Sequence, residues 1–447
     1  MLEFTGGSTH NCEGIHRRTF LKIGALGLAG LTLPNLLRWR AAASAVGKET
    51  KDTAVILLWL GGGPSQFETY DPKPQAPVEY RGPFQPIATR LPGVHICELL
   101  PRQAQILDKM AIIRSCAHKE SGHGSAVKNL NTGYLHPPNT NEGSFLYPAV
   151  GAIVAKVREQ QRRQLPNYVC IPSARIFKDD IGGGAYLGPA YDPFAADPRE
   201  GPKALMLPAE LSASRLENRR KLLADLDRLR RDVDASGMME GMDAFTRQAF
   251  EMVTGKAARD ALDLSQEPAQ VREKYGLASV RRGFPWGQGC LLARRLVEAG
   301  VSFVAVGLEG WDDHGKIKDE MLGRAAAFDA AVASLVEDLY ARGLDKKVLV
   351  LIWGEFGRTP RINKDAGRDH WPSSMSVVLA GGGLKMGQVI GSTDDKGEKP
   401  KDRPLHPNDV LATVYRHLGI DITQAFINPA GRPIPILPHG EPIEELF

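Results

Sequence analysis

Carboxylates, imidazoles and arginines gather in three short motifs in the C-terminal half of the chain. They are Gly-Trp-Asp-Asp-His-Gly at 310–315, Gly-Glu-Phe-Gly-Arg-Thr at 354–359 and Gly-Arg-Asp-His-Trp-Pro at 367–372. Carboxylates and imidazoles delivered by separate segments are the usual ligands of a Zn²⁺, Mn²⁺ or similar site. In the alternative interpretation, the carboxylates cap turns and the arginines only neutralise them. Three such motifs together favour a shared metal or polar site.

A fourth polar group, at 116–125, contains His118, His123 and Ser125. It lies between an expected strand and the start of an expected helix, a position that favours anions because the first amides of a helix are unpaired. Each histidine could serve as a metal ligand or as a base near neutral pH. The alternative is that both are ordinary surface histidines.

Apolar runs that end just before these motifs predict the strands that must position them. We expect strands at 54–60, 110–114, 167–171, 301–306, 347–353 and 376–380. Helices are expected at 101–109, 124–133, 290–299, 320–341 and 408–418. Such alternation indicates an α/β fold with a doubly wound, mostly parallel sheet. Open sheets of this kind bind ligands beyond the carboxyl ends of their strands. The polar motifs lie in the segments that come directly after these strand ends.

One stretch, from about 210 to 275, interrupts the alternation. It begins with a charged segment that carries Leu222, Leu226 and Leu229 on one helical face. We expect a helical insertion that lies over the sheet and keeps its balanced charges in solvent. Three glycine triplets elsewhere, at 61–63, 182–184 and 381–383, continue into neither nucleotide-binding signature and are mostly expected to be turns.

The N-terminal segment has the pattern of an export signal. Arg17 and Arg18 are followed by Phe-Leu-Lys and an apolar stretch from Ile23 to Leu37, the twin-arginine form of a signal peptide. The apolar run is shorter than the ~20 residues that cross a bilayer, although an uncleaved anchor is the alternative. We therefore expect a signal at 1–45, a folded α/β domain at 46–447 and transfer by the twin-arginine machinery to the periplasm or cell envelope, with no membrane span in the mature chain.

The charge balance supports this division. The chain has a formal net charge of +4, and residues 1–45 hold five basic and two acidic side chains. The remainder is close to neutral and has no run of basic residues interleaved with aromatics, so a nucleic-acid partner is not expected. Four cysteines follow the signal, at 97, 116, 170 and 290. None forms a C-x-x-C pair, and an oxidising compartment would permit one or two disulfides.

These motifs together resemble one bacterial family. The twin-arginine signal, Gly-Gly-Pro-Ser at 62–65 and the three C-terminal motifs look like the exported domain-of-unknown-function family fifteen-zero-one, which is abundant in planctomycetes. The resemblance covers nearly the whole mature chain. That family in turn resembles the alkaline phosphatase and sulfatase superfamily, which implies a doubly wound sheet and an esterase site with one or two metal ions.

The resemblance also implies roles for individual residues. A divalent metal ion, Zn²⁺, Mn²⁺ or Ca²⁺, would be held by these five side chains: Asp312, His314, Glu355, Asp369 and His370. Arg358 or Arg368 would pair with the anionic group of a substrate. Counting along the sulfatase pattern places His123 at the nucleophile position, with Ser125 as an alternative nucleophile. Leu60 and Gly61 stand where the superfamily has a metal-binding Asp.

Two functions follow as expectations. The first is an exported metal-dependent hydrolase of phosphate or sulfate esters, with a small molecule or a polysaccharide as substrate. His123 would then act as base or nucleophile, or a metal-activated water would attack. The second is a degenerate, non-catalytic relative that binds a glycan or a partner in the cell envelope.

Overall fold

An eight-stranded sheet lies at the centre of the part of the chain that the computed structural model describes, residues 52–136, 145–159, 161, 165–172, 181–202, 255–277 and 285–447. The strand order is β12-β4-β11-β8-β1-β7-β5-β6. The strands are β1 (Ala54–Trp59), β4 (Met110–Cys116), β5 (Tyr168–Ile171), β6 (Phe194–Ala195), β7 (Phe303–Gly307), β8 (Val348–Trp353), β11 (Met375–Gly381) and β12 (Gln388–Ile390). All neighbouring pairs are parallel except those that β11 makes with β4 and β8. The predicted mostly parallel α/β sheet is confirmed.

The central strands are continuous apolar runs because both of their faces are covered. Every residue of β1 and of β8 is buried, as expected for strands between two layers of helices. Their pairing places Trp59 beside Trp353 on one side and beside Gly307 on the other. Strands β7, β1 and β8 therefore end at the same edge, and the segments that follow them start from neighbouring points.

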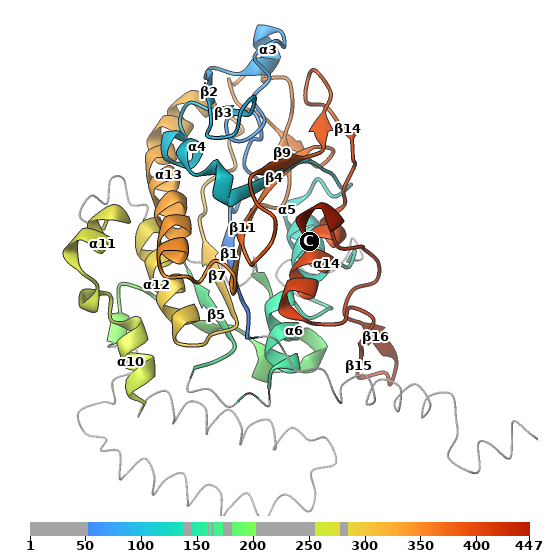
Figure 1. Ribbon diagram of the computed structural model, residues 1–447. Helices are drawn as coiled ribbons and strands as arrows, with labels where there is room; N and C mark the ends of the chain where they lie inside the picture. Colours follow the sequence, from blue (N-terminus) through green and yellow to red (C-terminus); the bar gives the residue numbers. More distant parts are fainter. Residues whose placement is uncertain are drawn as a thin grey trace, which may run out of the picture. The chain divides into compact units, whose positions relative to one another are not determined.

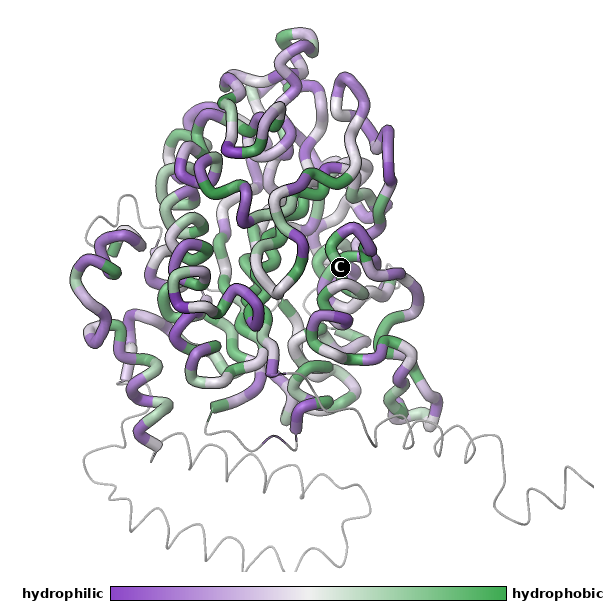
Figure 2. Tube along the Cα trace, in the orientation of Figure 1, coloured by the Kyte–Doolittle hydropathy of each residue, from purple (hydrophilic) through white to green (hydrophobic). Residues whose placement is uncertain are grey.

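Helices cover both faces of the sheet (Figure 1). On one side lie α4 (Pro101–Gln105), α12 (Trp286–Glu298) and α13 (Ile317–Ala341), and on the other lie α5 (His123–Thr132), α6 (Val150–Val157) and α14 (Pro407–Leu418). The hydrophobic residues concentrate between these helices and the strands (Figure 2). Helix α5 ends where Gly133 adopts a left-handed conformation with φ of 77°, the predicted glycine stop. The doubly wound architecture is thus present.

Short elements complete the described chain. The helices are α3 (Val78–Arg81), α10 (Lys256–Leu262), α11 (Ala269–Lys274) and the 3₁₀ turns η1 (Leu107–Lys109), η2 (Ala185–Leu187), η3 (Pro189–Tyr191), η5 (Leu264–Gln266) and η6 (Glu444–Leu446). The two-stranded pairs are β2 (Pro86–Ala88) with β3 (His95–Cys97), β9 (Gly357–Arg358) with β10 (His370–Trp371), and β13 (Ser392–Thr393) with β14 (Pro400–Asp402). A separate unit contains the hairpin of β15 (Ala425–Ile427) and β16 (Pro433–Pro435).

Two predicted segments fall largely outside the described residues. The signal at 1–45 lies wholly outside them, and the insertion expected at 210–275 is described only from 255, where α10 and α11 are helical. No helix in the described ranges combines the length and the apolar character that a membrane crossing needs.

The four cysteines that follow the predicted signal are all buried, and no disulfide joins them in the described chain. Burial raises the pKa of the Cys97 and Cys290 thiols to about 12. These cysteines are therefore inert core residues, and the disulfides that the sequence permitted do not form among them.

Candidate metal centre

Three imidazole rings converge on one carboxylate at the carboxyl edge of the sheet. Asp312 and His314 lie on the segment after β7, His123 opens α5 and His370 lies on β10. Nε2 of His123 is 3.3 Å from Oδ2 of Asp312. Nε2 of His314 and of His370 lie 3.1 and 3.2 Å from the other oxygen, Oδ1. Three segments distant in sequence thus deliver four metal-ligating side chains to one point.

The second nitrogen of each ring is held by an acceptor. The pairs are His123 Nδ1 with Glu355 Oε1 at 2.7 Å, His314 Nδ1 with Asp369 Oδ1 at 2.7 Å, and His370 Nδ1 with the Ser121 carbonyl oxygen at 2.8 Å. Carbonyl and carboxylate oxygens only accept, and such oxygens face both nitrogens of each ring. The contacts at Nδ1 are shorter than the contacts of 3.1–3.3 Å that Nε2 makes with Asp312, so they favour the tautomer in which a neutral ring donates from Nδ1 and keeps a lone pair on Nε2. Metal-bound histidines are oriented by outer partners in this way.

The spacing of the lone pairs fits a shared cation. Nε2 of His314 is 3.1 Å from Nε2 of His370, and neither has a proton to offer the other when Nδ1 donates. Two lone pairs at this distance repel unless a cation lies between them. Zn–N bonds of ~2.0–2.1 Å at a tetrahedral angle separate two ligand nitrogens by about 3.3 Å. His123, Asp312 and His370 also offer ligand atoms that all lie within 4.8 Å of one another.

Arg358 meets the same carboxylate from the protein interior. The arginine side chain is fully buried, and its Nη2 donates to Asp312 Oδ1 at 2.6 Å. Its other donors reach the carbonyl oxygens of Gly62, Gly63 and Arg368. Every terminal nitrogen of the guanidinium is therefore engaged by the protein.

The glycines after β1 let the site segments approach one another. Gly62 has φ of 109°, and a Cβ there would lie 2.5 Å from the backbone nitrogen of Asp312, so only glycine fits. Its own amide donates to Glu355 Oε1 at 2.8 Å. The carbonyl oxygen of Gly61 accepts from the amide of Trp311 at 3.0 Å. This loop therefore holds the Glu355 carboxylate and the backbone of the segment that carries Asp312.

The residue between the two ligands on the 310–315 segment points away from the site. Asp313 is buried and pairs with Arg324 of α13. Arg324 also donates to the Gly310 carbonyl oxygen at 2.6 Å and stacks over the Trp311 ring at 4.7 Å. An arginine of the helical layer thereby fixes the segment that carries Asp312 and His314.

Arg368 lies apart from the cluster and serves the fold. Its guanidinium is fully buried and forms an ion pair with the buried Glu68 at 2.8 Å. It donates as well to the carbonyl oxygens of Thr359, Pro360 and Tyr80. Arg358 is engaged in the same way, so the protein's own oxygens already occupy both of the guanidinium groups that we expected to pair with an anionic substrate.

Electrostatics favour ionised carboxylates at the site. Burial acts to raise the pKa of Asp312, but the hydrogen bond and the charge of Arg358 outweigh it and hold the pKa at about 2. The hydrogen bond from His314 lowers the pKa of Asp369. Burial lowers the pKa of His370, whereas the hydrogen bond to Glu355 raises that of His123. The site is accessible, since 46% of the Asp312 side chain and 48% of the His314 side chain are exposed.

The remaining histidine and hydroxyl of the 116–125 group do not join the cluster. His118 is buried, its Nδ1 accepts from the Glu120 amide, and burial lowers its pKa to about 4. The Ser125 hydroxyl donates to the Gly122 carbonyl oxygen at 3.2 Å, and among the described residues no hydrogen bond joins it to Asp312 or the three rings. Of the side chains of His118, His123 and Ser125, the structure brings only that of His123 into the cluster, as a neighbour of the expected ligands.

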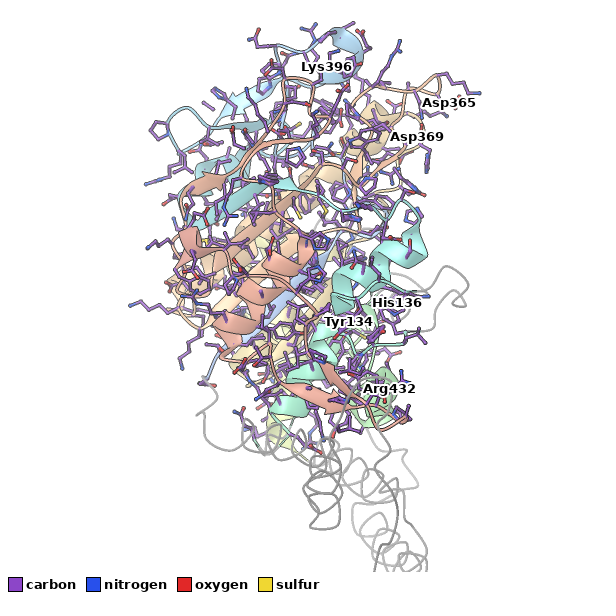
Figure 3. The ribbon with its side chains drawn as sticks, turned by 90° about the vertical axis from the view of Figure 1, so that its right-hand side faces the viewer. Tyr134, His136, Asp365, Asp369, Lys396 and Arg432 are labelled. Atoms are coloured by element: carbon purple, nitrogen blue, oxygen red, sulfur yellow. The ribbon has the colours of Figure 1, made fainter. Side chains whose placement is uncertain are left out.

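Two groups at the site were missed in the sequence. The Asn363 side chain donates to Asp369 Oδ1 at 3.2 Å and to the His314 carbonyl oxygen at 2.9 Å. The Asn-Lys-Asp-Ala-Gly pattern at 363–367 is a turn signal that could have indicated it. The Ser121 carbonyl oxygen has no signal in the sequence. Figure 3 shows Asp365 and Asp369 on one loop, near the end of α5 opposite to Tyr134 and His136.

Comparison with known proteins places this chain in a family. The family described as "Protein of unknown function (DUF1501)" matches residues 52–447, and the chain belongs to it. The family identified from the motifs is therefore confirmed. No curated protein matches the chain.

Solved structures that resemble the chain belong to the alkaline phosphatase and sulfatase superfamily. PsFucS1 sulfatase from Pseudoalteromonas sp. is 12% identical, with 87% of this chain and 72% of that chain covered and a TM-score of 0.38. Alkaline phosphatase from the Antarctic bacterium TAB5 is 12% identical, with 84% and 100% covered and a TM-score of 0.37. A protein in the alkaline phosphatase superfamily from Vibrio parahaemolyticus is 10% identical, with 84% and 68% covered and a TM-score of 0.37.

Proposed function

We propose that this member of the DUF1501 family is an exported metal-dependent hydrolase of phosphate or sulfate esters. The observation that carries the proposal is the convergence of three Nε2 atoms on Asp312 while each Nδ1 is held by an acceptor. Imidazoles fixed in this tautomer and aimed at one point are prepared for a cation.

The donor set favours a first-row transition metal. His123, Asp312, His314 and His370 would hold the ion, and Glu355 and Asp369 would orient two of the rings. Nitrogen donors suit Zn²⁺ and are accepted by Mn²⁺, whereas Ca²⁺ prefers an all-oxygen site. Of the three metals expected from the sequence, we therefore favour Zn²⁺ or Mn²⁺.

Water is the attacking group that the cluster supports best. A bound divalent ion would polarise the ester and lower the pKa of a water molecule. Among the described residues, no hydroxyl or thiol is hydrogen-bonded to the cluster, so a covalent intermediate on Ser125 is not favoured. His123 exchanges its Nδ1 proton only with Glu355, which keeps Nε2 directed to the reacting side.

Localisation and substrate belong to the same proposal. The paired arginines at 17 and 18 support export by the twin-arginine machinery, which carries folded proteins and would allow the metal to be acquired first. The exported protein would act in the periplasm or cell envelope. Its expected target there is an ester group of a small molecule or of a polysaccharide.

One observation favours a second candidate, a binding protein without catalysis. Both arginines expected to hold the substrate anion are buried and already paired. A site of this kind could bind a glycan or an envelope partner through an ion and leave it uncleaved.

A direct experiment separates the two. The purified full-length protein is stripped with a chelator, reloaded with Zn²⁺ or Mn²⁺, and assayed with chromogenic phosphate and sulfate esters alongside His370→Ala. We expect turnover that depends on metal and is lost in the variant, with metal content measured on each sample. Metal bound without turnover of any ester would support the binding protein, and failure to bind either metal would contradict both.

A further inference from the structure

The phenyl ring of Phe356 packs against two of the imidazoles of the cluster. Its centroid lies 4.3 Å from that of His370, with the ring planes at 31°, and 5.1 Å from that of His123, with the planes at 44°. The two imidazoles are 4.4 Å apart at 75°, so each of the three rings contacts the other two. Phe356 is fully buried, whereas 40% of the His123 side chain and 20% of the His370 side chain are exposed. The phenyl ring therefore supports both imidazoles from the interior.

The phenyl ring has little room to move away from them. A Cβ on Gly63 would lie 2.5 Å from its Cδ2 atom, so the ring lies directly against the backbone of the glycine loop after β1. The guanidinium carbon of Arg358 lies 5.7 Å from the ring centroid. Glu355 and Arg358, on either side of Phe356 in the chain, are each paired with a side chain of the cluster. The segment 355–358 is thus held at both ends, with the phenyl ring between them.

The hydrogen bonds at Nδ1 leave one freedom of these imidazoles unrestrained. His123 and His370 each have one short contact at that nitrogen, with Glu355 Oε1 and with the Ser121 carbonyl oxygen. Such a contact restrains the position of Nδ1, but the ring can still turn about it because the χ2 torsion of histidine is broad. Turning would move Nε2 away from Asp312. A close-packed flat side chain against the ring removes this freedom.

We propose that Phe356 is a positioning residue of the metal centre: its ring sets the planes of His123 and His370, so that both Nε2 atoms are directed at Asp312. The inference rests on the proposed metal site and adds what orients its imidazoles besides hydrogen bonds. The third imidazole, that of His314, contacts the His370 ring at 4.7 Å, but among the described residues no ring contact joins it to Phe356. Loss of the phenyl ring should therefore disturb two of the three imidazoles.

Metal binding by Phe356→Leu tests this role. Leucine keeps an apolar side chain in the core but provides no flat ring, so the two imidazoles can turn in the metal-free protein. We expect calorimetric titration with ZnCl₂ to show an affinity that is lower by ~10–100-fold, as for other outer groups of metal sites. Co²⁺ is accepted by the same kinds of ligand. The visible spectrum of the Co²⁺-loaded variant should differ from that of the intact protein, because the geometry of the ligands changes.

The matched control is Phe67→Leu. Phe67 is also buried, but its ring centroid lies 4.3 Å from the guanidinium carbon of Arg368, which lies apart from the cluster. Both variants should lose stability towards urea, and only Phe356→Leu should lose affinity and change the Co²⁺ spectrum. Equal affinities and spectra in the two folded variants would overturn the inference and leave the proposed hydrolase intact. Failure of the intact protein to bind metal would contradict the proposed function itself.

The intact protein provides a measurement that needs no variant. In a crystal structure of the Zn²⁺-loaded protein, Phe356 should remain in ring contact with both His123 and His370 while these bind the ion. Imidazoles that bind the ion while turned away from the phenyl ring would overturn the role of Phe356, even if Phe356→Leu does not fold.

Discussion

Two fully buried arginines in the same part of the sequence, Arg358 and Arg368, have opposite kinds of carboxylate partner. Arg368 pairs with Glu68, which is 1% exposed and whose other contacts are internal. Arg358 pairs with Asp312, which is 46% exposed and faces three imidazoles with its remaining lone pairs. Both partners of the Arg368–Glu68 pair are buried, and we call it the closed pair. The Arg358–Asp312 pair exposes its carboxylate to solvent, and we call it the open pair.

The difference separates a structural from a functional ion pair. A buried pair with every donor and acceptor engaged fixes the fold, and breaking it leaves an uncompensated charge in the interior. A carboxylate that is held by an arginine on one side and exposed on the other is fixed in place yet able to take a ligand. Both motifs contain an arginine and an acidic residue, so composition alone does not distinguish them.

The sharpest way to test the closed pair is to remove its carboxylate charge. Glu68→Gln should lower the free energy of unfolding by about 3 kcal/mol or more, because Arg368 stays charged and buried. Urea unfolding of the variant measures this, with the exposed Glu79→Gln as the matched control. A loss below ~1 kcal/mol would mean that the two pairs do not differ as described.

At the open pair, the same neutralisation should affect ligand binding more than stability. Asp312→Asn removes the shared carboxylate, so we expect Mn²⁺ affinity to fall by more than the ~10–100-fold that outer partners of a metal site contribute. Urea stability of the metal-free variant should fall by less than that of Glu68→Gln, because solvent at the half-exposed Asp312 weakens its pair with Arg358. An unchanged affinity in the calorimeter would contradict the centre.

A smaller effect is expected from an outer partner of the cluster. Asp369→Asn keeps the shape of the side chain but weakens its hold on His314 Nδ1, so Mn²⁺ or Zn²⁺ affinity should fall by ~10–100-fold. Metal titration of Asp369→Asn beside Asp365→Asn, a carboxylate on the same loop, measures the difference. Equal affinities would show that the His314–Asp369 contact has no part in binding.

The open pair should also make the free energy of unfolding depend on pH in the acid range. The pKa of Asp312 is lowered from 3.8 to about 2 in the folded protein, so its ionisation stabilises the fold above about pH 3.8 and this contribution is lost as the pH falls towards 2. Stability of the metal-free protein should therefore decline more steeply across this window than that of Asp312→Asn. Chemical unfolding at several pH values compares the slopes, and identical slopes would contradict the contribution of Arg358.

The smallest effect is expected at the hydroxyl outside both pairs. Ser125 donates to Gly122 and makes no described hydrogen bond to the cluster. Ser125→Ala should leave ester turnover within about twofold and metal affinity unchanged, since surface substitutions away from special features have small effects. Loss of turnover at unchanged metal content would instead identify Ser125 as the nucleophile.

Much of the architecture followed from apolar runs. The strand expected at 347–353 is β8 (Val348–Trp353), and the helix expected at 320–341 is α13 (Ile317–Ala341). Such elements are predictable because a buried strand or a long helix is determined mainly by its own residues. The direction of β11 was not predictable, because it depends on where the chain crosses the sheet before strand pairing begins.

The site was predictable in part, since its side chains follow strands that end at one edge. Which side chains pair with one another within the site was not predictable. Arg368 and Glu68 are 300 residues apart in sequence, and no local pattern indicates which of two arginines pairs with which carboxylate. The orientation of His123, with Nδ1 towards Glu355, likewise depends on the tertiary meeting of α5 with the end of β8.

The alternation along the 310–315 segment constrains how this sequence can change. Asp312 and His314 face the exposed cluster, while Asp313 between them is held by Arg324 beneath. Inserting or deleting one residue here would exchange the two sides, burying a ligand and exposing the carboxylate that Arg324 requires. Relatives that keep the centre should therefore vary in the residues around this segment but never in its length.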